Sequence, residues 1–282
     1  MPIYRPVELK AFLNSLSINA RKSLSQNFLI DGNIIKKIVN SADLTSDDLV
    51  LEIGSGPGAL TEEFLERGAQ VIAIEKDNTL APELRRLEAS EEKLQIFHQD
   101  ITKVDLEAII KARLKPGQKV KVIASIPYQI TSPIITALAP MYDIISKVVI
   151  VIQDEVAKRC TAKPGNKSFS SLTLFLNYYS KPRYAFVINK SCFYPAPKVD
   201  SAVLSLDLIK PRYDKEETEK LFDIIHAGFQ KRRKTLKASL KDLYTPAQTE
   251  KALLKLGLNS AARPEELSLD QFCALFEELK PI

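Results

Sequence analysis

The order of apolar and polar residues predicts alternating strands and helices between residues 48 and 160. Short apolar runs indicate buried strands, and apolar side chains that recur every three to four residues indicate helices. The predicted strands are Asp48–Ile53, Gln70–Glu75, Leu94–His98, Lys119–Ala124 and Ser146–Ile152. The predicted helices are Gly58–Arg67, Asn78–Leu87, Val104–Lys111, Ser132–Ala139 and Gln153–Cys160. This alternation is typical of an α/β fold, a mostly parallel sheet with helices on both faces.

Two later stretches, Tyr184–Ile188 and Val199–Leu208, also have the pattern of strands, but no long helix separates them. We therefore expect an antiparallel edge on the sheet. After about residue 210 the pattern is helical only. One apolar stripe comprises Leu221, Ile224, Ile225 and Phe229, another comprises Leu269, Phe272, Leu275 and Phe276, and Gly257 could end a short helix between them. We expect an α/β domain over residues 1–210 and a small all-α domain over residues 211–282.

Composition limits the classes of protein to consider. Apolar residues make up 45% and charged residues 27% of the 282 residues, as in soluble globular proteins. We see no apolar run near the ~18 residues that a membrane helix needs and no signal-peptide layout. The three cysteines are far apart and the two histidines are few, so we expect no metal site. A reduced, cytoplasmic protein is the simplest interpretation.

The net charge of +5 is compatible with a polyanionic partner. The segment from Gln230 to Lys241 carries six cations and no acid, and we favour phosphate contacts over a solvated helix face for it. The candidate phosphate contacts in this segment are Lys231, Arg232, Arg233 and Lys234. For the second cluster, Arg21 and Lys22, the sequence does not separate these two interpretations.

A glycine-rich turn closes the first predicted strand, in the run Leu51-Glu52-Ile53-Gly54-Ser55-Gly56-Pro57-Gly58. Glycine lets the backbone turn sharply and approach a ligand closely, and the following helix offers free N–H groups. The Gly-x-Gly-x-Gly spacing differs from the dinucleotide fingerprint, and the turn lacks the Gly-Lys-Ser/Thr of a P-loop. It suits a nucleoside ligand without a pyrophosphate.

Acidic residues end the next two strands. Glu75 can accept hydrogen bonds from both ribose hydroxyls, Asp100 can accept from the exocyclic amine of an adenine, and Ile101 can pack on its ring. Each acid by itself could instead cap a helix. Ligands of such sheets bind at the carboxyl ends of the strands, so three consecutive strand ends favour a shared site.

The fourth strand ends in the tetrapeptide Ser125-Ile126-Pro127-Tyr128. Pro127 fixes its own φ and restricts Ile126 to extended geometry, so the loop is stiff. Its oxygens can accept from an amino group on a flat ring while Tyr128 stacks on that ring. A plain turn would explain the tetrapeptide alone, but its place beside the other three strand ends favours an amine site.

These motifs resemble the class I S-adenosylmethionine-dependent methyltransferases, and within them the small-subunit ribosomal RNA adenine dimethyltransferases (the KsgA family). The resemblance covers nearly the whole chain. It includes Gln26-Asn27-Phe28-Leu29, Glu52 to Gly58, Glu75, Asp100-Ile101, Ser125 to Tyr128, Phe193 to Ser201 and the basic segment Gln230 to Leu236. It implies a Rossmann-like catalytic domain over residues 1–210 and an RNA- or ribosome-binding domain over residues 211–282.

The resemblance also implies residue roles. Asn27, Leu29, Gly54, Gly56, Glu75, Asp100, Ile101 and Ser125 would bind S-adenosylmethionine. Ser125, Ile126, Pro127 and Tyr128 would receive the target adenine, and Phe193 and Tyr194 would enclose it, although ordinary packing explains those two aromatics as well. Arg21, Lys22 and the cations from Lys231 to Lys234 would contact RNA. The family usually has Asn at position 125, and the hydroxyl of Ser125 reaches less far than an amide.

By resemblance, the expected reaction is dimethylation of two adjacent adenosines in a hairpin near the 3′ end of small-subunit rRNA. The partner would be an immature 30S-type subunit and the enzyme a monomer. A large-subunit dimethyltransferase of the antibiotic-resistance type is the nearest alternative. Because Ser125 replaces the usual Asn, a non-catalytic ribosome-assembly factor that retains the fold is another alternative. A small-molecule methyltransferase would not need the basic segment.

Overall fold

We describe the protein from a computed structural model, in which residues 2–18, 26–88, 90, 92–231 and 234–280 are described. Four of the candidate RNA contacts, Arg21, Lys22, Arg232 and Arg233, lie outside these residues. The chain divides into two compact units. The first comprises Met1–Ala157 with Lys181–Leu208, and the second comprises Lys158–Ser180 with Ile209–Ile282.

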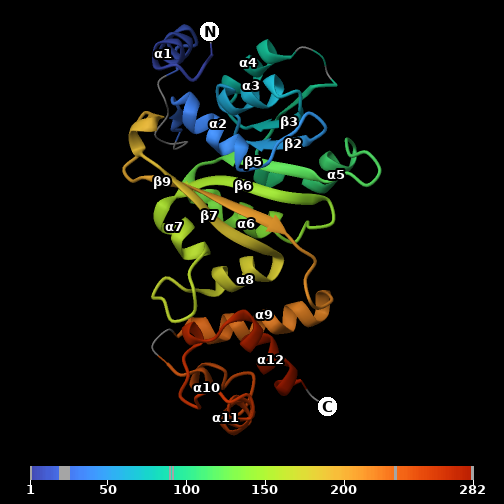
Figure 1. The fold of residues 1–282 in the computed structure, drawn as a ribbon, viewed down its shortest axis with the longest axis vertical. Helices are drawn as coiled ribbons and strands as arrows, with labels where there is room; N and C mark the ends of the chain where they lie inside the picture. Colours follow the sequence, from blue (N-terminus) through green and yellow to red (C-terminus); the bar gives the residue numbers. More distant parts are fainter. Residues whose placement is uncertain (1, 19–25, 89, 91, 232–233, 281–282) are drawn as a thin grey trace. The chain divides into compact units, whose positions relative to one another are not determined.

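The first unit is built on a seven-stranded sheet with the order β4-β3-β2-β5-β6-β9-β7 (Figure 1). The strands are β2 (Leu49–Ile53), β3 (Gln70–Glu75), β4 (Leu94–His98), β5 (Val120–Ser125), β6 (Ile145–Gln153), β7 (Ser180–Ile188) and β9 (Ser201–Leu208). The strands from β4 to β6 pair in parallel, and β9 pairs antiparallel with β6. The predicted mostly parallel sheet with an antiparallel edge is confirmed.

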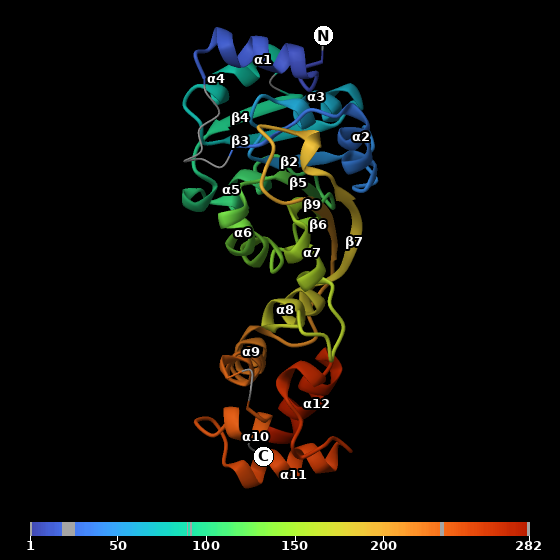
Figure 2. The ribbon, with the colours of Figure 1, turned by 90° about the vertical axis from the view of Figure 1, so that its left-hand side faces the viewer.

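Helices cover both faces of this sheet. The helices of this part of the chain are α1 (Pro6–Ser15), α2 (Gly32–Asn40), α3 (Ala59–Glu66), α4 (Leu80–Glu83), α5 (Leu106–Lys111), α6 (Thr131–Leu138) and α7 (Asp154–Cys160). Figure 2 shows α5 and α6 on the side opposite α2 and α3. All five residues of β2, including Glu52, are buried between these layers, which explains why the other four positions are apolar. The helix predicted over 78–87 is instead α4 followed by a 3₁₀ turn, Leu84–Leu87.

A separate two-stranded sheet joins distant parts of the first unit. β1 (Phe28–Leu29) pairs antiparallel with β8 (Phe193–Tyr194), so that Phe28 faces Tyr194 and Leu29 faces Phe193. Neither strand was predicted, because two residues carry no periodic signal. This pairing brings two motifs of the sequence analysis side by side.

The second unit is built of helices joined by loops in its described residues, except that Ser180 begins β7. It contains α8 (Ser171–Tyr179), α9 (Lys215–Gln230), α10 (Leu236–Ser239), α11 (Pro246–Lys255) and α12 (Leu269–Leu279). The two predicted apolar stripes lie on α9 and α12, where their residues contribute to a shared core. Gly257 has a φ of +69°, and the Leu258 N–H bonds the Leu253 carbonyl at 2.9 Å, as predicted for a helix that ends at this glycine.

The boundary between the units differs from the sequence expectation in one segment. We expected residues 158–180 in the first domain, but they group with the second unit. Aromatic contacts explain this placement, because the rings of Phe175 and Tyr178 on α8 lie 5.4 and 5.3 Å from that of Phe222 on α9. Such contacts between residues far apart in the chain leave no local pattern.

Candidate active site

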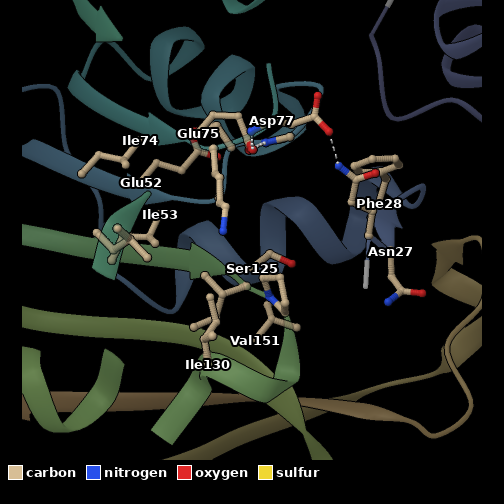
Figure 3. Close-up of a pocket in the computed structure, with 18 of the residues that line it drawn as sticks. Asn27, Phe28, Glu52, Ile53, Ile74, Glu75, Asp77, Ser125, Ile130 and Val151 are labelled. Carbon is tan, nitrogen blue, oxygen red and sulfur yellow. Dashed lines mark hydrogen bonds between the residues drawn. The ribbon is translucent and has the colours of Figure 1, made fainter. Parts of the chain in front are cut away.

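A cavity of about 610 Å³ lies at the carboxyl ends of β2, β3, β4 and β5 (Figure 3). Of the residues predicted to bind the cofactor or to receive and enclose the target base, all but Tyr194 line it. They are Asn27, Leu29, Gly54, Gly56, Glu75, Asp100, Ile101, Ser125, Ile126, Pro127, Tyr128 and Phe193. Lys231 and Lys234 are exposed in the second unit.

The glycine loop after β2 is shaped by its neighbours. Gly54 and Gly56 have φ values of +74° and +55°, which residues with a Cβ rarely adopt. A Cβ on Gly54 would lie 3.4 Å from the Ser125 carbonyl oxygen, and one on Gly56 would lie 3.2 Å from the Phe28 ring. Glycine therefore lets the tetrapeptide and Phe28 close in on the loop from two sides.

Glu75 is fixed at the end of β3 by backbone donors. The Gly56 N–H donates to its Oε2 at 2.7 Å and the Asp77 N–H to its Oε1 at 2.8 Å. Burial raises the pKa of this carboxyl, and the N–H bonds oppose that rise. A carboxylate has about four acceptor positions, so this carboxyl can still accept from a ligand's hydroxyl.

Asp100 is held as an anion beside the same cavity. Lys76 Nζ lies 2.8 Å from its Oδ2, while the Thr102 N–H and hydroxyl donate to its Oδ1 at 3.0 and 2.8 Å. The bond from Lys76, followed by those from Thr102, lowers its pKa to about 2. Asp100 caps the 3₁₀ turn Ile101–Lys103, so both interpretations of this acid apply: it caps a helical turn and lines the pocket.

The tetrapeptide lies where β5 ends. Ser125 is its last strand residue and pairs with Val151 of β6, while Tyr128 begins a 3₁₀ turn. The Tyr128 hydroxyl forms a 2.7 Å hydrogen bond with Ser201 Oγ, and burial raises the pKa of the phenol. The bond fixes one edge of the ring. Phe193 lines the same cavity and is 4% exposed.

This arrangement can hold a nucleoside along three strand ends and a second flat ring at the fourth. The ribosomal RNA adenine dimethylase family model matches residues 17–281. The chain belongs to this family.

Two curated relatives are similar to this chain over nearly their whole length. The ribosomal RNA small subunit methyltransferase A of Protochlamydia amoebophila is 49% identical over 279 residues, which are 99% of this chain and 98% of that protein. The protein of the same name from Chlamydia trachomatis is 40% identical over 277 residues, 98% of both chains.

Two solved structures have the same fold as this dimethylase family member. The 23S rRNA methyltransferase ErmE matches with a TM-score of 0.71 at 28% identity, covering 90% of this chain and 99% of that one. A dimethyladenosine transferase from Plasmodium falciparum matches with a TM-score of 0.70 at 25% identity, covering 88% and 95%. The class I methyltransferase fold expected from the sequence is thereby confirmed.

The pocket of this dimethylase family member also contains side chains to which the sequence analysis gave no role. Glu52 is 1% exposed beneath the glycine loop, and the Thr61 hydroxyl donates to its Oε2 at 2.5 Å. Burial raises the pKa of Glu52 to about 7. Gln26, Phe28 and Asp77 also line the cavity. The motif that contains Asn27 pointed to the first two, and nothing in the sequence singled out Asp77.

Neither a metal centre nor a membrane-spanning helix occurs within the described residues. No three His, Cys, Asp or Glu side chains there are placed to hold a metal ion. No helix in that part of the chain is long and apolar enough to cross a membrane.

Proposed function

We propose that this protein is an S-adenosylmethionine-dependent methyltransferase that dimethylates two adjacent adenosines in a hairpin near the 3′ end of small-subunit rRNA. The observation that carries the proposal is the pocket in which acids suited to a nucleoside adjoin a turn suited to an aromatic amine. Membership of the adenine dimethylase family and the 49% identity over nearly the whole chain support this activity.

The residues present fit the cofactor. At Gly54 and Gly56 a Cβ would crowd the loop, and its absence leaves the backbone accessible to the methionine end. Glu75 has acceptor positions for the ribose hydroxyls, and the Asp100 carboxylate can accept from the adenine amine. Asn27, Leu29 and Ile101 complete the walls of this part of the pocket. When bound, S-adenosylmethionine supplies an activated methyl group.

The tetrapeptide orients the target base. The Ser125 hydroxyl and the Ile126 carbonyl accept hydrogen bonds from the adenine amino group, so its lone pair points at the methyl donor. Tyr128 stacks on the base and Phe193 encloses it. Holding the reactants in line can lower the barrier by several kcal/mol, about 7–11 at the upper end. No general base is needed, since the methylated nitrogen is acidic and releases its proton to water.

RNA reaches this pocket with its target base unstacked. An adenosine in a loop costs less to extract than one in a duplex. The exposed Lys231 and Lys234, together with Arg21, Lys22, Arg232 and Arg233, contact RNA phosphates, which makes binding salt-dependent. The partner is an immature 30S-type subunit, on which a monomer acts in the cytoplasm.

The test is a methyl-transfer assay with labelled S-adenosylmethionine and small subunits that lack the modification. Mass spectrometry of the rRNA should find two methyl groups on each of two adjacent adenosines. A Tyr128→Ala variant, sampled at the same early time points, serves as the matched control and should transfer methyl groups more slowly. Unlabelled small-subunit RNA after prolonged incubation with the wild type would contradict the proposal.

A large-subunit substrate is the second candidate, because the fold matches the 23S rRNA methyltransferase ErmE. The identity to that protein, 28%, is well below the 49% to the small-subunit relative. The same assay with large subunits separates the two. Methyl groups on large-subunit RNA alone would replace our proposal, and methyl groups on neither RNA would favour the assembly factor that Ser125 keeps open.

A further inference from the structure

The segment from Gln26 to Ile30, which we call the strap, links the two ends of the pocket. At one end the Gln26 side-chain amide donates to Asp77 Oδ2 at 2.8 Å. At the other end Phe28 and Leu29 pair with β8, and the Ile30 N–H bonds the Cys192 carbonyl at 2.9 Å. The strap thus contacts both the loop after β3 and the strand that carries Phe193. Figure 3 shows Phe28 and Asn27 on the same side of the pocket as Asp77.

Asp77 is a rigid anchor for the strap. Its side chain is 6% exposed, and its Oδ1 accepts from the N–H groups of Thr79 and Leu80 at 2.8 and 3.1 Å. Its own N–H donates to Glu75 Oε1. The position of Gln26 is therefore tied, through one residue, to the Glu75 carboxyl, the group that we propose binds the ribose.

The other half of the strap contacts the glycine loop and the strand that carries Phe193. The Phe28 ring packs on Gly56 of the glycine loop. Its neighbour Leu29 is in register with Phe193. A displacement of the strap would move the wall of the cofactor site and the partner strand of Phe193 together, since paired backbones shift as a unit.

We propose that the Gln26–Asp77 hydrogen bond makes cofactor binding and RNA binding reinforce each other, an inference that rests on the proposed function. Gln26 and Asp77 are positioning residues. Cofactor bound to Glu75 stabilises the strap in its anchored position. The strap in turn positions β8, which carries Phe193, to receive the target adenine. Coupling of this kind is reciprocal, so RNA tightens cofactor binding by the factor by which cofactor tightens RNA binding.

The test exchanges the hydrogen-bond donor and acceptor between positions 26 and 77. Gln26→Glu places two carboxylates face to face and should weaken S-adenosylhomocysteine binding by about tenfold, the effect of about 1.4 kcal/mol. Asp77→Asn alone should change little, because its oxygen still accepts from Thr79 and Leu80 and the Gln26 amide can rotate to accept from the new amide. The double variant Gln26→Glu/Asp77→Asn restores a donor–acceptor pair and should recover wild-type affinity.

Calorimetry measures S-adenosylhomocysteine affinity with and without a hairpin RNA that contains two adjacent adenosines. The wild type and the double variant should bind more tightly with RNA, and Gln26→Glu should lose this gain. Gln118→Glu is the matched control, because Gln118 bonds the Asp47 carbonyl before β2, at the opposite end of the strand from the pocket. Gln26→Met, which removes the side-chain amide without adding a charge, replaces Gln26→Glu if that variant does not fold.

Equal affinities and equal RNA gains in Gln26→Glu and the wild type would overturn the inference. So would a double variant that binds as weakly as Gln26→Glu, because the effect would then not depend on the hydrogen bond. A wild type that fails to bind S-adenosylhomocysteine would overturn the proposed function, and this inference with it.

Discussion

Replacing Glu52 with Gln should stabilise the protein at neutral and alkaline pH. Glu52 is almost completely buried beneath the glycine loop, and burial raises its pKa from 4.5 to about 7. Between these two values the folded chain holds a proton that the unfolded chain has released. The free energy of unfolding therefore falls as the pH rises through this interval, by about 3 kcal/mol in total. The substituted amide has no proton to release, and its oxygen can still accept from Thr61.

Urea unfolding of the wild type and Glu52→Gln at a series of pH values measures this effect. The difference in free energy between the two proteins should shift in favour of the variant between about pH 4.5 and pH 7 and then stay constant. Glu66→Gln, an exposed change on α3, is the control for loss of one carboxyl. Parallel curves for the wild type and Glu52→Gln across the interval would refute the reasoning, because Glu52 would then be ionised in both states.

Three further changes test the site. Tyr128→Ala should lower turnover by about 10- to 100-fold, which corresponds to the stacking energy of one base, while S-adenosylhomocysteine still binds. Tyr128→Phe should keep turnover but lower the melting temperature, because the buried Ser201 hydroxyl loses its hydrogen-bond partner. Asp100→Asn should weaken cofactor binding at every pH above about 4, since the native carboxyl has a pKa of about 2 and stays ionised there. Lys231→Glu with Lys234→Glu should weaken RNA binding and flatten its salt dependence, and an unchanged slope would contradict phosphate contact.

Local pattern was sufficient for most of the fold. β3 and β4 begin and end at the predicted residues, and the other strands of the parallel region differ by a residue or so at their ends. The helix after Asn78 was less predictable. It ends in a 3₁₀ turn that follows Pro82, and Leu84 and Leu87 of this turn contact Gly58 of the glycine loop. Residues 158–180 were assigned to the wrong unit because their aromatic partners lie some forty residues further along the chain.

Some residues of the candidate site could likewise be predicted from the sequence, and others could not. The glycine loop, Glu75, Asp100 and the tetrapeptide could be found because each follows a strand, and parallel strands bring their carboxyl ends together. The alignment of Phe193 with Leu29 could not be found, because it depends on a pairing of two-residue strands. Nor could the roles of Glu52 and Asp77, which depend on burial and on which donors face them.

The sequence alone determined the alternating elements of the parallel sheet, the chemistry at each of its strand ends and the resemblance to the adenine dimethylases, because these reside in neighbouring residues and their spacing. Tertiary structure alone decided which distant groups touch: Gln26 with Asp77, β1 with β8, and Tyr128 with Ser201. It also set the charge states, from Glu52 with a pKa of about 7 to Asp100 with one of about 2. Two carboxyls of similar intrinsic acidity differ this much because one is cut off from water and the other pairs with a lysine.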